Sequence, residues 1–341
     1  MGSVGGNSAK ATSGINGAET RYQAQHGVHD TLAGFQADTM HSGDDLAEPH
    51  LVQTLVAQSA QAVEWLSSFG VDLSSLVQCG GHSVPRTHRE PPWADGKPAP
   101  VGWDIIAALK RYVDETKTKA MASATSAGGP LACGSIDVVT NATVVGLLQD
   151  AQGKGVTGVQ YLLDGNKTPI DLVGDAVILS TGGFAYDTHT HSTHSFVRQY
   201  APRFQNLPTT NGSFAVGDGV RLAMAVGADL VDMDKIQVHP TSFVDPAAPK
   251  NGVKFLAPEA LRGCGAVLLN DQGVRFADEL GRRDYLSKAI FEQHPVAAAA
   301  DAAGILESVN VNMVLNDRAV DLFGRAAFDV RCYYDFVYYC L

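Results

Sequence analysis

Several residue patterns are scarce in this sequence, and each shortage excludes a class of protein. The five cysteines stand apart from one another and form no Cys-x-x-Cys pair. That spacing fits neither a zinc site nor a dense disulfide framework, so a reducing compartment is the simple expectation. The cysteines are Cys79, Cys133, Cys264, Cys332 and Cys340.

Charge and long apolar runs are also scarce. Only 18% of the residues are charged and 45% are hydrophobic, which argues against a disordered polyelectrolyte and for sizeable cores. The net charge of −11 repels nucleic acid and anionic membrane surfaces, so we expect neither as a partner. No apolar run approaches the ~20 residues of a membrane-spanning helix, and the first residues do not resemble a signal peptide. A soluble chain of one or two domains is therefore expected.

Two helices and a loop are predicted in the first third of the chain. Residues 51–69 carry apolar side chains near a 3.6-residue period and end at Gly70. A second helix is predicted from Asp104, which is a plausible N-cap. Residues 79–103 are rich in Pro and Gly, and we expect a solvated loop packed on the domain. The apolar residues of the first helix are Leu51, Leu55, Val63 and Leu66, and the loop contains Arg86, Arg89, Trp93 and Trp103.

Residues 136–180 switch to strand patterning. The runs 136–148, 156–163 and 169–172 are separated by Gly-containing turns and predict a small meander. The next run, 175–180, is apolar at its centre and is predicted to be a buried parallel strand. It ends in Thr181-Gly182-Gly183, and a Gly pair at such a strand end is where α/β sheets admit ligands.

The segments that follow have simpler interpretations. Gly217-Asp218-Gly219 opens a predicted helix of small residues that stops at Gly227, where Asp218 serves as a cap. Three histidines stand close together in residues 187–194, but no cysteines or acids at matching spacing complete a metal site. We predict a solvated loop there and no metal. The histidines are His189, His191 and His194.

The most informative stretch is 234–284. Four ionisable side chains lie close to Gly or Pro in it: His239, Glu259, Arg262 and Arg283. Arginine offers a planar fork that matches a carboxylate bidentately, and a neutral imidazole can donate one further hydrogen bond. For either arginine alone, a surface ion pair with a nearby acid is the simpler interpretation. Together they predict a site for a small substrate with two carboxylates.

The stretch also resembles the capping-domain segment of soluble flavin-dependent fumarate reductases of the fungal and kinetoplastid type. These belong to the FAD-dependent oxidoreductase superfamily that includes succinate dehydrogenase flavoprotein subunits. The resemblance runs from about residue 4 to roughly residue 328, with its sequence words in the family's order. The words are GGNSAKATSGINGA (5–18), TGGF (181–184), LPTTNG (207–212), VGDG (216–219), QVHPT (237–241), APEALRG (257–263) and ELGRRDY (279–285).

The resemblance implies an α/β fold with two incomplete domains. Residues 1–234 would form a Rossmann-like FAD-binding domain with a β-meander, and residues 235–329 an α+β capping domain. Residues 330–341 match nothing in the family, and we expect this aromatic tail to be poorly ordered. Family members begin with a Gly-x-Gly-x-x-Gly unit that is missing here and continue well past residue 329. We therefore expect the chain to be truncated at both ends.

The resemblance implies FAD as the cofactor and fumarate and succinate as substrate and product. A hydride from reduced FAD would reach one alkene carbon, and Arg283 would give a proton to the other. Glu259 and Arg262 would relay protons to Arg283, and His239 would hold a substrate carboxylate. The residues implied to line FAD are Asn7, Ser8, Thr12, Ser13, Gly14, Thr181, Gly182 and Asp218.

The resemblance leaves the donor, the compartment and two other interpretations open. NADH is a candidate electron donor, through a reductase module outside this sequence, and the cytosol, the mitochondrion and a glycosome-like organelle all fit. One alternative is a truncated, inactive remnant, which would be colourless because it lacks FAD contacts and poorly soluble because its sheet edges are exposed. The other is a sister flavoenzyme that acts on another dicarboxylate or activated alkene.

Overall fold

The computed structural model describes residues 2–44, 46–96, 99–127, 135–189, 194–294, 305–325 and 338–340. The chain divides into two compact units, each described here by itself. The first comprises Met1–Gly6, Val113–Gln205 and Asn211–Ile236, and the second Asn7–Tyr112, Asn206–Thr210 and Gln237–Leu341. Helix α4 (Val101–Ala127) has residues in both. Among the helices that the structure describes, none is long and apolar enough to cross a membrane.

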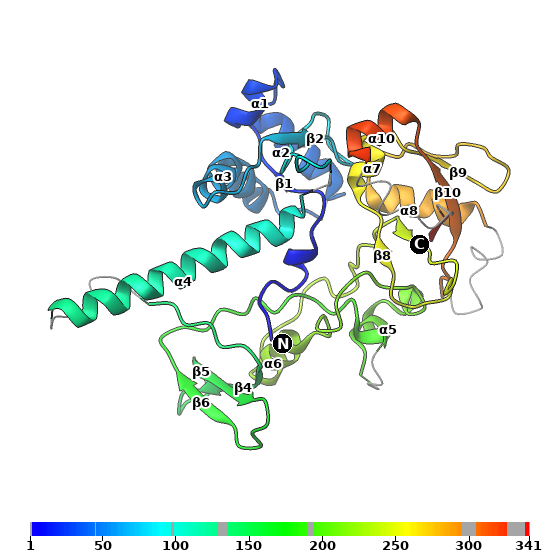
Figure 1. Ribbon diagram of the computed structural model, residues 1–341. Helices are drawn as coiled ribbons and strands as arrows, with labels where there is room; N and C mark the ends of the chain where they lie inside the picture. The colour runs from blue at the N-terminus through cyan, green and yellow to red at the C-terminus, as the bar shows by residue number, and fades with distance from the viewer. Residues whose placement is uncertain are drawn as a thin grey trace. The chain divides into compact units, whose positions relative to one another are not determined.

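The first unit contains the predicted meander. Strands β4 (Ala142–Gln149), β5 (Val156–Leu163) and β6 (Ile170–Val173) form an antiparallel sheet in the order β4-β5-β6 (green in Figure 1). The second strand has the predicted bounds, whereas the first begins at Ala142 and not at residue 136. The mixed helix and strand composition agrees with the predicted fold class.

The predicted parallel strand over 175–180 is wrong. This segment has no strand pairing, and Ile178 is 87% exposed. A run of apolar residues becomes a buried parallel strand only where neighbouring strands pair with it and helices cover both faces. Within the described residues all paired strands of the sheets are antiparallel, and none lies against 175–180.

The rest of the first unit is made of short helices. Helix α6 begins at Asp218 and ends at Ala225, so Asp218 is its first residue and not its cap. The cap is Gly217, whose φ of 83° is in the left-handed region that glycine adopts without strain. The other elements are η2 (Asp187–His189), α5 (Phe196–Tyr200) and η3 (Pro202–Phe204). Of the predicted histidine tract, residues 190–193 lie outside the described residues.

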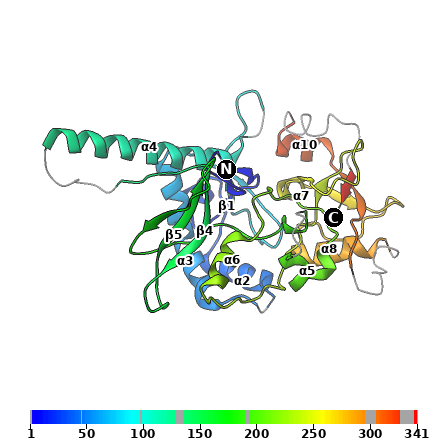
Figure 2. The same ribbon diagram turned by 90° about the horizontal axis from the view of Figure 1, so that it is seen from below.

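The second unit begins with helices around a three-stranded sheet of order β1-β3-β2, antiparallel throughout. A core cluster joins Val63 and Leu66 of α3 to Val101 and Ala108 of α4, so α3 lies beside the first turns of α4 (Figures 1 and 2). The elements are η1 (Ser8–Lys10), β1 (Ile15–Asn16), α1 (Arg21–Gln25), α2 (Leu32–Ser42), α3 (Pro49–Ser68), β2 (Ser75–Val77) and β3 (Thr87–Arg89).

The two predicted helices are confirmed, but details of both differ. The buried side of α3 is formed by Val52, Val56, Ser59, Val63 and Leu66. Leu51 and Leu55 are instead 59% and 56% exposed. Because leucines and valines recur at helical spacing on two sides of this helix, only its packing decides which side is buried. Helix α4 begins at Val101, so Asp104 lies in its first turn and is not the cap.

The predicted solvated loop over 79–103 is also wrong in part. Residues Thr87–Arg89 form the central strand β3 of the first sheet, and their side chains are buried. Arg86 is fully buried and makes a bidentate contact with Asp30, with Nε to Oδ2 at 3.0 Å and Nη2 to Oδ1 at 2.8 Å. Trp93 is exposed, as expected of a loop, and Trp103 is exposed but lies in the first turn of α4.

The second unit also contains a five-stranded antiparallel sheet of order β8-β7-β11-β10-β9. Strand β11 (Tyr338–Cys340), from the tail that was predicted to be poorly ordered, lies between β10 and β7. Residues 326–337 lie outside the described part. The remaining elements are β7 (Ser242–Phe243), β8 (Phe255–Leu256), α7 (Glu259–Gly263), β9 (Val267–Leu269), α8 (Arg283–Glu292), β10 (Asn310–Val314) and α10 (Asp317–Phe323).

The boundary between a FAD-binding and a capping domain stays a prediction. The chain passes from the first unit to the second between Ile236 and Gln237, close to the boundary predicted after residue 234. Residues 7–112, which the prediction gave to the first domain, cluster with the second unit.

Candidate active site

A single turn of helix places two of the predicted site residues together. Helix α7 begins at Glu259, directly after Pro258, and Arg262 follows one turn later. At this i,i+3 spacing the side chains share one side of the helix, and Arg262 Nη2 lies 3.9 Å from Glu259 Oε2. Both are almost fully buried, with 5% and 1% of Glu259 and Arg262 exposed.

Arg283 reaches the same carboxylate from α8, of which it is the first residue. Its Nη2 and Nε donate to Glu259 Oε2 at 2.8 and 3.2 Å, and its Nη1 donates to Gln237 Oε1 at 2.9 Å. The side chain is 41% exposed, in contrast to Glu259 and Arg262. A guanidinium has five N–H donors, so two remain without a partner among the described residues. Arg283 is therefore the one of the three that can contact a ligand.

His239 belongs to the same cluster. Its pKa is lowered to about 4, first by burial and then by the positive charges of Arg283 and Arg262. The imidazole is therefore neutral at neutral pH. Its Nδ1 lies 2.8 Å from the carbonyl oxygen of Thr241 and 3.3 Å from the backbone nitrogen of the same residue. Nδ1 can thus donate to the first or accept from the second, and the second arrangement leaves a proton on Nε2.

Glu259 is the electrostatic centre of this cluster. Burial raises the pKa of its carboxyl, but the charges of Arg262 and Arg283 outweigh burial and lower it overall. The carboxylate is therefore ionised at neutral pH although it is almost inaccessible to water. A buried anion between two cations can accept a proton from one of them and return it.

Arg262 is held differently from Arg283. Only its Nη1 has a hydrogen bond, to the carbonyl oxygen of Glu279 at 2.7 Å, while its Nε and Nη2 are buried without one. Burial lowers its pKa, and the charge of Glu259 opposes that shift. Because unpaired buried donors are costly, this guanidinium is less stable as a cation than an ordinary arginine.

Three contacts of the cluster were not predicted from sequence. They are the backbone N–H of Gly80, which donates to Glu259 Oε1 at 2.6 Å, the side chain of Gln237, which accepts from Arg283, and the backbone carbonyl oxygen of Glu279, which accepts from Arg262. Gln237 stands two residues before His239 in the motif QVHPT (237–241), so its closeness to His239 in the sequence could have indicated that it belongs to the site. Gly80 is 179 positions from Glu259, and no local pattern indicates such a pairing.

The structure also locates the first set of predicted FAD-lining residues in the second unit. Asn7 and Ser8 are exposed, and Thr12, Ser13 and Gly14 are half-buried. The Thr12 hydroxyl oxygen is buried and has no hydrogen-bond partner. An orphaned hydroxyl next to a glycine backbone fits a cofactor that supplies polar atoms at close range. These residues therefore fit FAD.

Gly14 lies where no other residue fits. Its φ is +128°, and a Cβ there would lie 2.0 Å from the carbonyl oxygen of His88. We expect Gly14→Ala to lower the free energy of unfolding by at least ~1–3 kcal/mol, because the backbone must shift. Thermal unfolding followed by circular dichroism measures this. Gly27→Ala is the matched control, since Gly27 also has positive φ but nothing within 4 Å of an added Cβ. Equal losses in the two variants would contradict the steric explanation.

The second set of predicted FAD-lining residues lies in the first unit. Thr181 packs against the start of α6, since its Oγ1 would be 2.0 Å from a Cβ on Gly219. This brings Thr181 and Gly182 to the helix end that carries Asp218, whose side chain is exposed. The three residues are thus close together, as a shared ligand contact requires.

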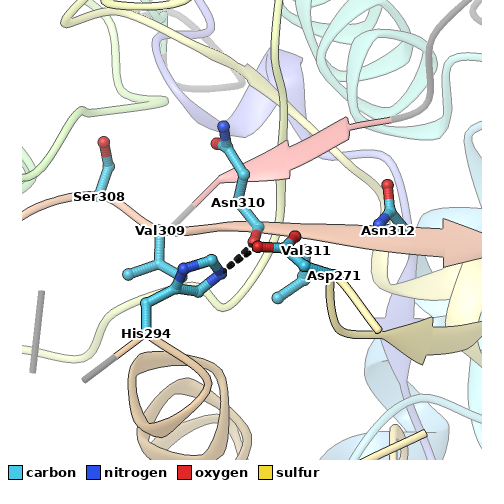
Figure 3. A pocket seen from close by; sticks show the side chains of 7 residues that line it. All are labelled: Asp271, His294, Ser308, Val309, Asn310, Val311 and Asn312. Atoms are coloured by element: carbon cyan, nitrogen blue, oxygen red, sulfur yellow. Dashed lines mark hydrogen bonds and ion pairs between the residues drawn. The ribbon is translucent and has the colours of Figure 1, made fainter. Parts of the chain in front are cut away.

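Two other features lie away from this cluster. Among the described residues, no three His, Cys, Asp or Glu side chains gather so as to hold a metal ion. A cavity of about 340 Å³ lies beside β10, where His294 Nε2 is 2.9 Å from the Asn310 carbonyl oxygen (Figure 3). None of the predicted site residues lines this cavity. Its lining residues are Asp271, His294, Ser308, Val309, Asn310, Val311 and Asn312.

Comparison with known proteins relates the chain to flavoproteins. It is 39% identical over 308 residues to the fumarate reductase of Schizosaccharomyces pombe, over 90% of this chain and 56% of that protein. It is 34% identical over 290 residues to an NADH:fumarate oxidoreductase of Klebsiella pneumoniae, over 85% of this chain and 27% of that protein. The chain thus spans little more than half the length of the first relative, and less of the second.

A solved structure and a family of domains also relate the chain to FAD-binding proteins. The open conformation of a flavocytochrome c3 fumarate reductase superposes with a TM-score of 0.65 at 28% identity, over 96% of this chain and 48% of that one. The family described as FAD binding domain matches residues 1–312. That span covers most of the sequence, including every residue of the cluster around Glu259. The chain belongs to this family of FAD-binding domains.

Proposed function

We propose that this protein reduces fumarate to succinate with FAD as its cofactor. The observation that carries the proposal is the ionised, buried Glu259 between buried Arg262 and half-exposed Arg283, with neutral His239 beside them. The cluster offers one guanidinium to a ligand and connects it to a carboxylate shielded from water. The names of the relatives support a dicarboxylate alkene as the substrate.

The predicted FAD-lining residues are proposed as cofactor contacts, and each set is described within its own unit. In the second, Thr12, Ser13 and Gly14 would approach FAD through backbone and hydroxyl groups, with Asn7 and Ser8 nearby. In the first, Thr181, Gly182 and Asp218 would contribute. When bound and reduced, FAD supplies a hydride to one alkene carbon of the substrate. Everything else in the reaction is assigned to this chain's own side chains.

Arg283 is the proposed proton donor. Arginine is a weak acid in water, with a pKa above ~12, so it needs a strongly basic acceptor and a route for recovering its proton. The alkene carbon opposite to hydride addition gains negative charge and is such an acceptor. Glu259, bonded to both Nε and Nη2 of Arg283, can return a proton to it. Arg262, whose pKa is lowered, would supply Glu259 in turn.

His239 is proposed to hold a substrate carboxylate. In the tautomer in which Nδ1 accepts from the Thr241 N–H, Nε2 carries the proton and can donate to a carboxylate oxygen. Arg283 adds a positive charge on the same side. The proposed substrate is thus bound by neutral and charged donors, and the Glu259 carboxylate beside them is already paired with Arg283.

Replacing Glu259 by glutamine tests the relay. We expect kcat to fall by ~10²–10⁴-fold with a smaller change in KM, since proton delivery is lost while Arg283 and His239 remain. Steady-state fumarate reduction with reduced viologen measures both constants, and flavin absorbance measures the cofactor. Glu292→Gln, on the exposed surface of α8, is the control and should leave both constants unchanged. A Glu259→Gln variant that keeps kcat and raises KM would contradict the relay.

The electron donor and the exact alkene need separate tests. We propose NADH as the donor, on the strength of the Klebsiella pneumoniae relative's name. NADH oxidation that depends on added fumarate, with the purified protein and a reductase module both present, measures this. Comparing fumarate with other dicarboxylates and activated alkenes distinguishes a sister enzyme, which would prefer one of the latter. A preparation with no flavin absorbance would favour the inactive remnant.

A further inference from the structure

We propose that Asp38 is a positioning residue for this site. Through the loop of residues 79–83, it holds the backbone N–H of Gly80 against Glu259. The inference deepens the proposed function and rests on it. It concerns a residue of α2 that touches none of the four predicted site residues in any contact described above.

The loop reaches the cluster through a contact that allows no side chain. Gly80 N donates to Glu259 Oε1 at 2.6 Å, whereas Arg283 binds the other oxygen, Oε2. A Cβ on Gly80 would lie 2.8 Å from that Oε1 and 3.0 Å from the carbonyl oxygen of Gly281. The two carboxylate oxygens thus have different partners, and the backbone amide fixes the rotation of the carboxylate between them.

The same loop also bonds to the segment that leads to Arg283. Gly81 N donates to the carbonyl oxygen of Leu280 at 2.9 Å, next to Glu279, whose own carbonyl holds Arg262. At the other side, Gly263 of α7 packs so closely that a Cβ would lie 2.2 Å from the carbonyl oxygen of Gln78. Residues 78–81 therefore contact both α7 and the approach to α8, and a displacement of the loop would reach all three charged side chains.

Asp38 binds Ser83, at the end of the loop that is farther from Gly80. Its Oδ2 accepts from Ser83 N at 2.7 Å and from Ser83 Oγ at 2.8 Å, and also from Arg86 Nη1. Asp30 binds the opposite edge of Arg86, and in the described part of the chain no hydrogen bond joins Asp30 to residues 79–83. The two aspartates therefore share the same buried arginine, but only Asp38 bonds the loop. This difference provides a matched pair of variants.

Loss of the Gly80 hydrogen bond should change the pKa of Glu259 in a direction that can be predicted. An N–H that donates to a carboxylate stabilises its ionised form, so withdrawing the donor raises the pKa of Glu259. If ionised Glu259 is needed, activity on the acid side is then lost at higher pH. Other charged or titratable groups near Glu259 affect its pKa both in the wild type and in a variant that lacks the Gly80 contact. They are Arg262 of α7, Arg283 of α8, His239, and Cys79 and His82 of the loop.

The test compares Asp38→Asn with Asp30→Asn in the purified protein. We expect Asp38→Asn to lower kcat about tenfold, with KM little changed, and to move the acid limb of the kcat profile up by about one pH unit. Asp30→Asn should destabilise the fold without moving that limb. Ser83→Ala, which removes one exposed contact to Asp38, should shift the limb in the same direction and by less. An unmoved limb in both Asp38→Asn and Ser83→Ala, with the wild-type protein active, would overturn the proposal.

A second readout does not depend on catalysis. Hydrogen exchange measured by mass spectrometry should show faster exchange in peptides that cover residues 79–83 in Asp38→Asn, and no such change in Asp30→Asn. If the protein proves unable to reduce fumarate, this measurement still decides whether Asp38 holds the loop. Equal exchange of these peptides in the wild type and in Asp38→Asn would show that Asp38 does not hold the loop.

Discussion

Replacing Arg283 by alanine should lower kcat for fumarate reduction by ~10²–10⁴-fold while FAD stays bound. Among the described residues of the Glu259 cluster, Arg283 is the only charged side chain that is partly exposed and also has N–H donors without a partner. Its removal takes away the proposed proton donor and leaves the predicted FAD-lining residues untouched. Stopped-flow oxidation of the reduced flavin by fumarate measures the step directly, and absorbance of the oxidised flavin measures occupancy.

The neighbouring arginine provides the control for this experiment. Arg282 precedes Arg283 but pairs with Asp44 at 2.7 Å and Asp284 at 2.9 Å, outside the cluster. Arg282→Ala should therefore keep kcat near that of the wild type. Fumarate reduction by Arg283→Ala at more than a small fraction of the wild-type rate would remove Arg283 from the donor role.

The same variant has a spectroscopic signature. The pKa of His239 is about 4, first because of burial and next because of the charge of Arg283. Removing that charge should raise the pKa toward the ordinary value of ~6.5. Proton NMR of the histidine ring measures it, and an unchanged titration would mean that the two side chains do not interact.

Replacing Arg86 by alanine should lower the free energy of unfolding by about 3–5 kcal/mol. Arg86 is fully buried, lies between Asp30 and Asp38, and has its guanidinium carbon 4.8 Å from the centre of the Phe35 ring. The substitution leaves two carboxylates without their cation, Asp30 being almost completely buried. Urea denaturation followed by tryptophan fluorescence measures the loss.

An exposed ion pair gives the contrasting result. Arg325 pairs with Asp321 at 2.8 Å, with half of its side chain exposed. Arg325→Ala should cost less than ~1 kcal/mol, because water and salt screen such a pair. If the Arg86 and Arg325 variants lose similar stability, the buried network does not stabilise the fold as argued.

Local patterns in the sequence were sufficient for some of the regular elements. The strand over 156–163 and the helix α3 follow from residue periodicity, which depends only on neighbours along the chain. The pairing of Glu259 with Arg262 also follows, since one helical turn separates them. The family resemblance extended this to the cluster of His239, Glu259, Arg262 and Arg283, which the structure brings together.

Other features depend on partners far away in the sequence. Apolar residues 175–180 stay exposed because no described strand pairs with them, and β11 formed in a tail for which disorder was predicted. The sequence predicts Arg86 to be a loop residue, because its partners Asp30 and Asp38 are 56 and 48 positions away. The Gly80 contact with Glu259 likewise joins segments 179 positions apart. The sequence by itself thus determined helix α3, the strand over 156–163 and the residue types that the site uses. The tertiary structure alone decided burial, strand pairing and the backbone contacts of the carboxylate, because these depend on which distant segments pack together.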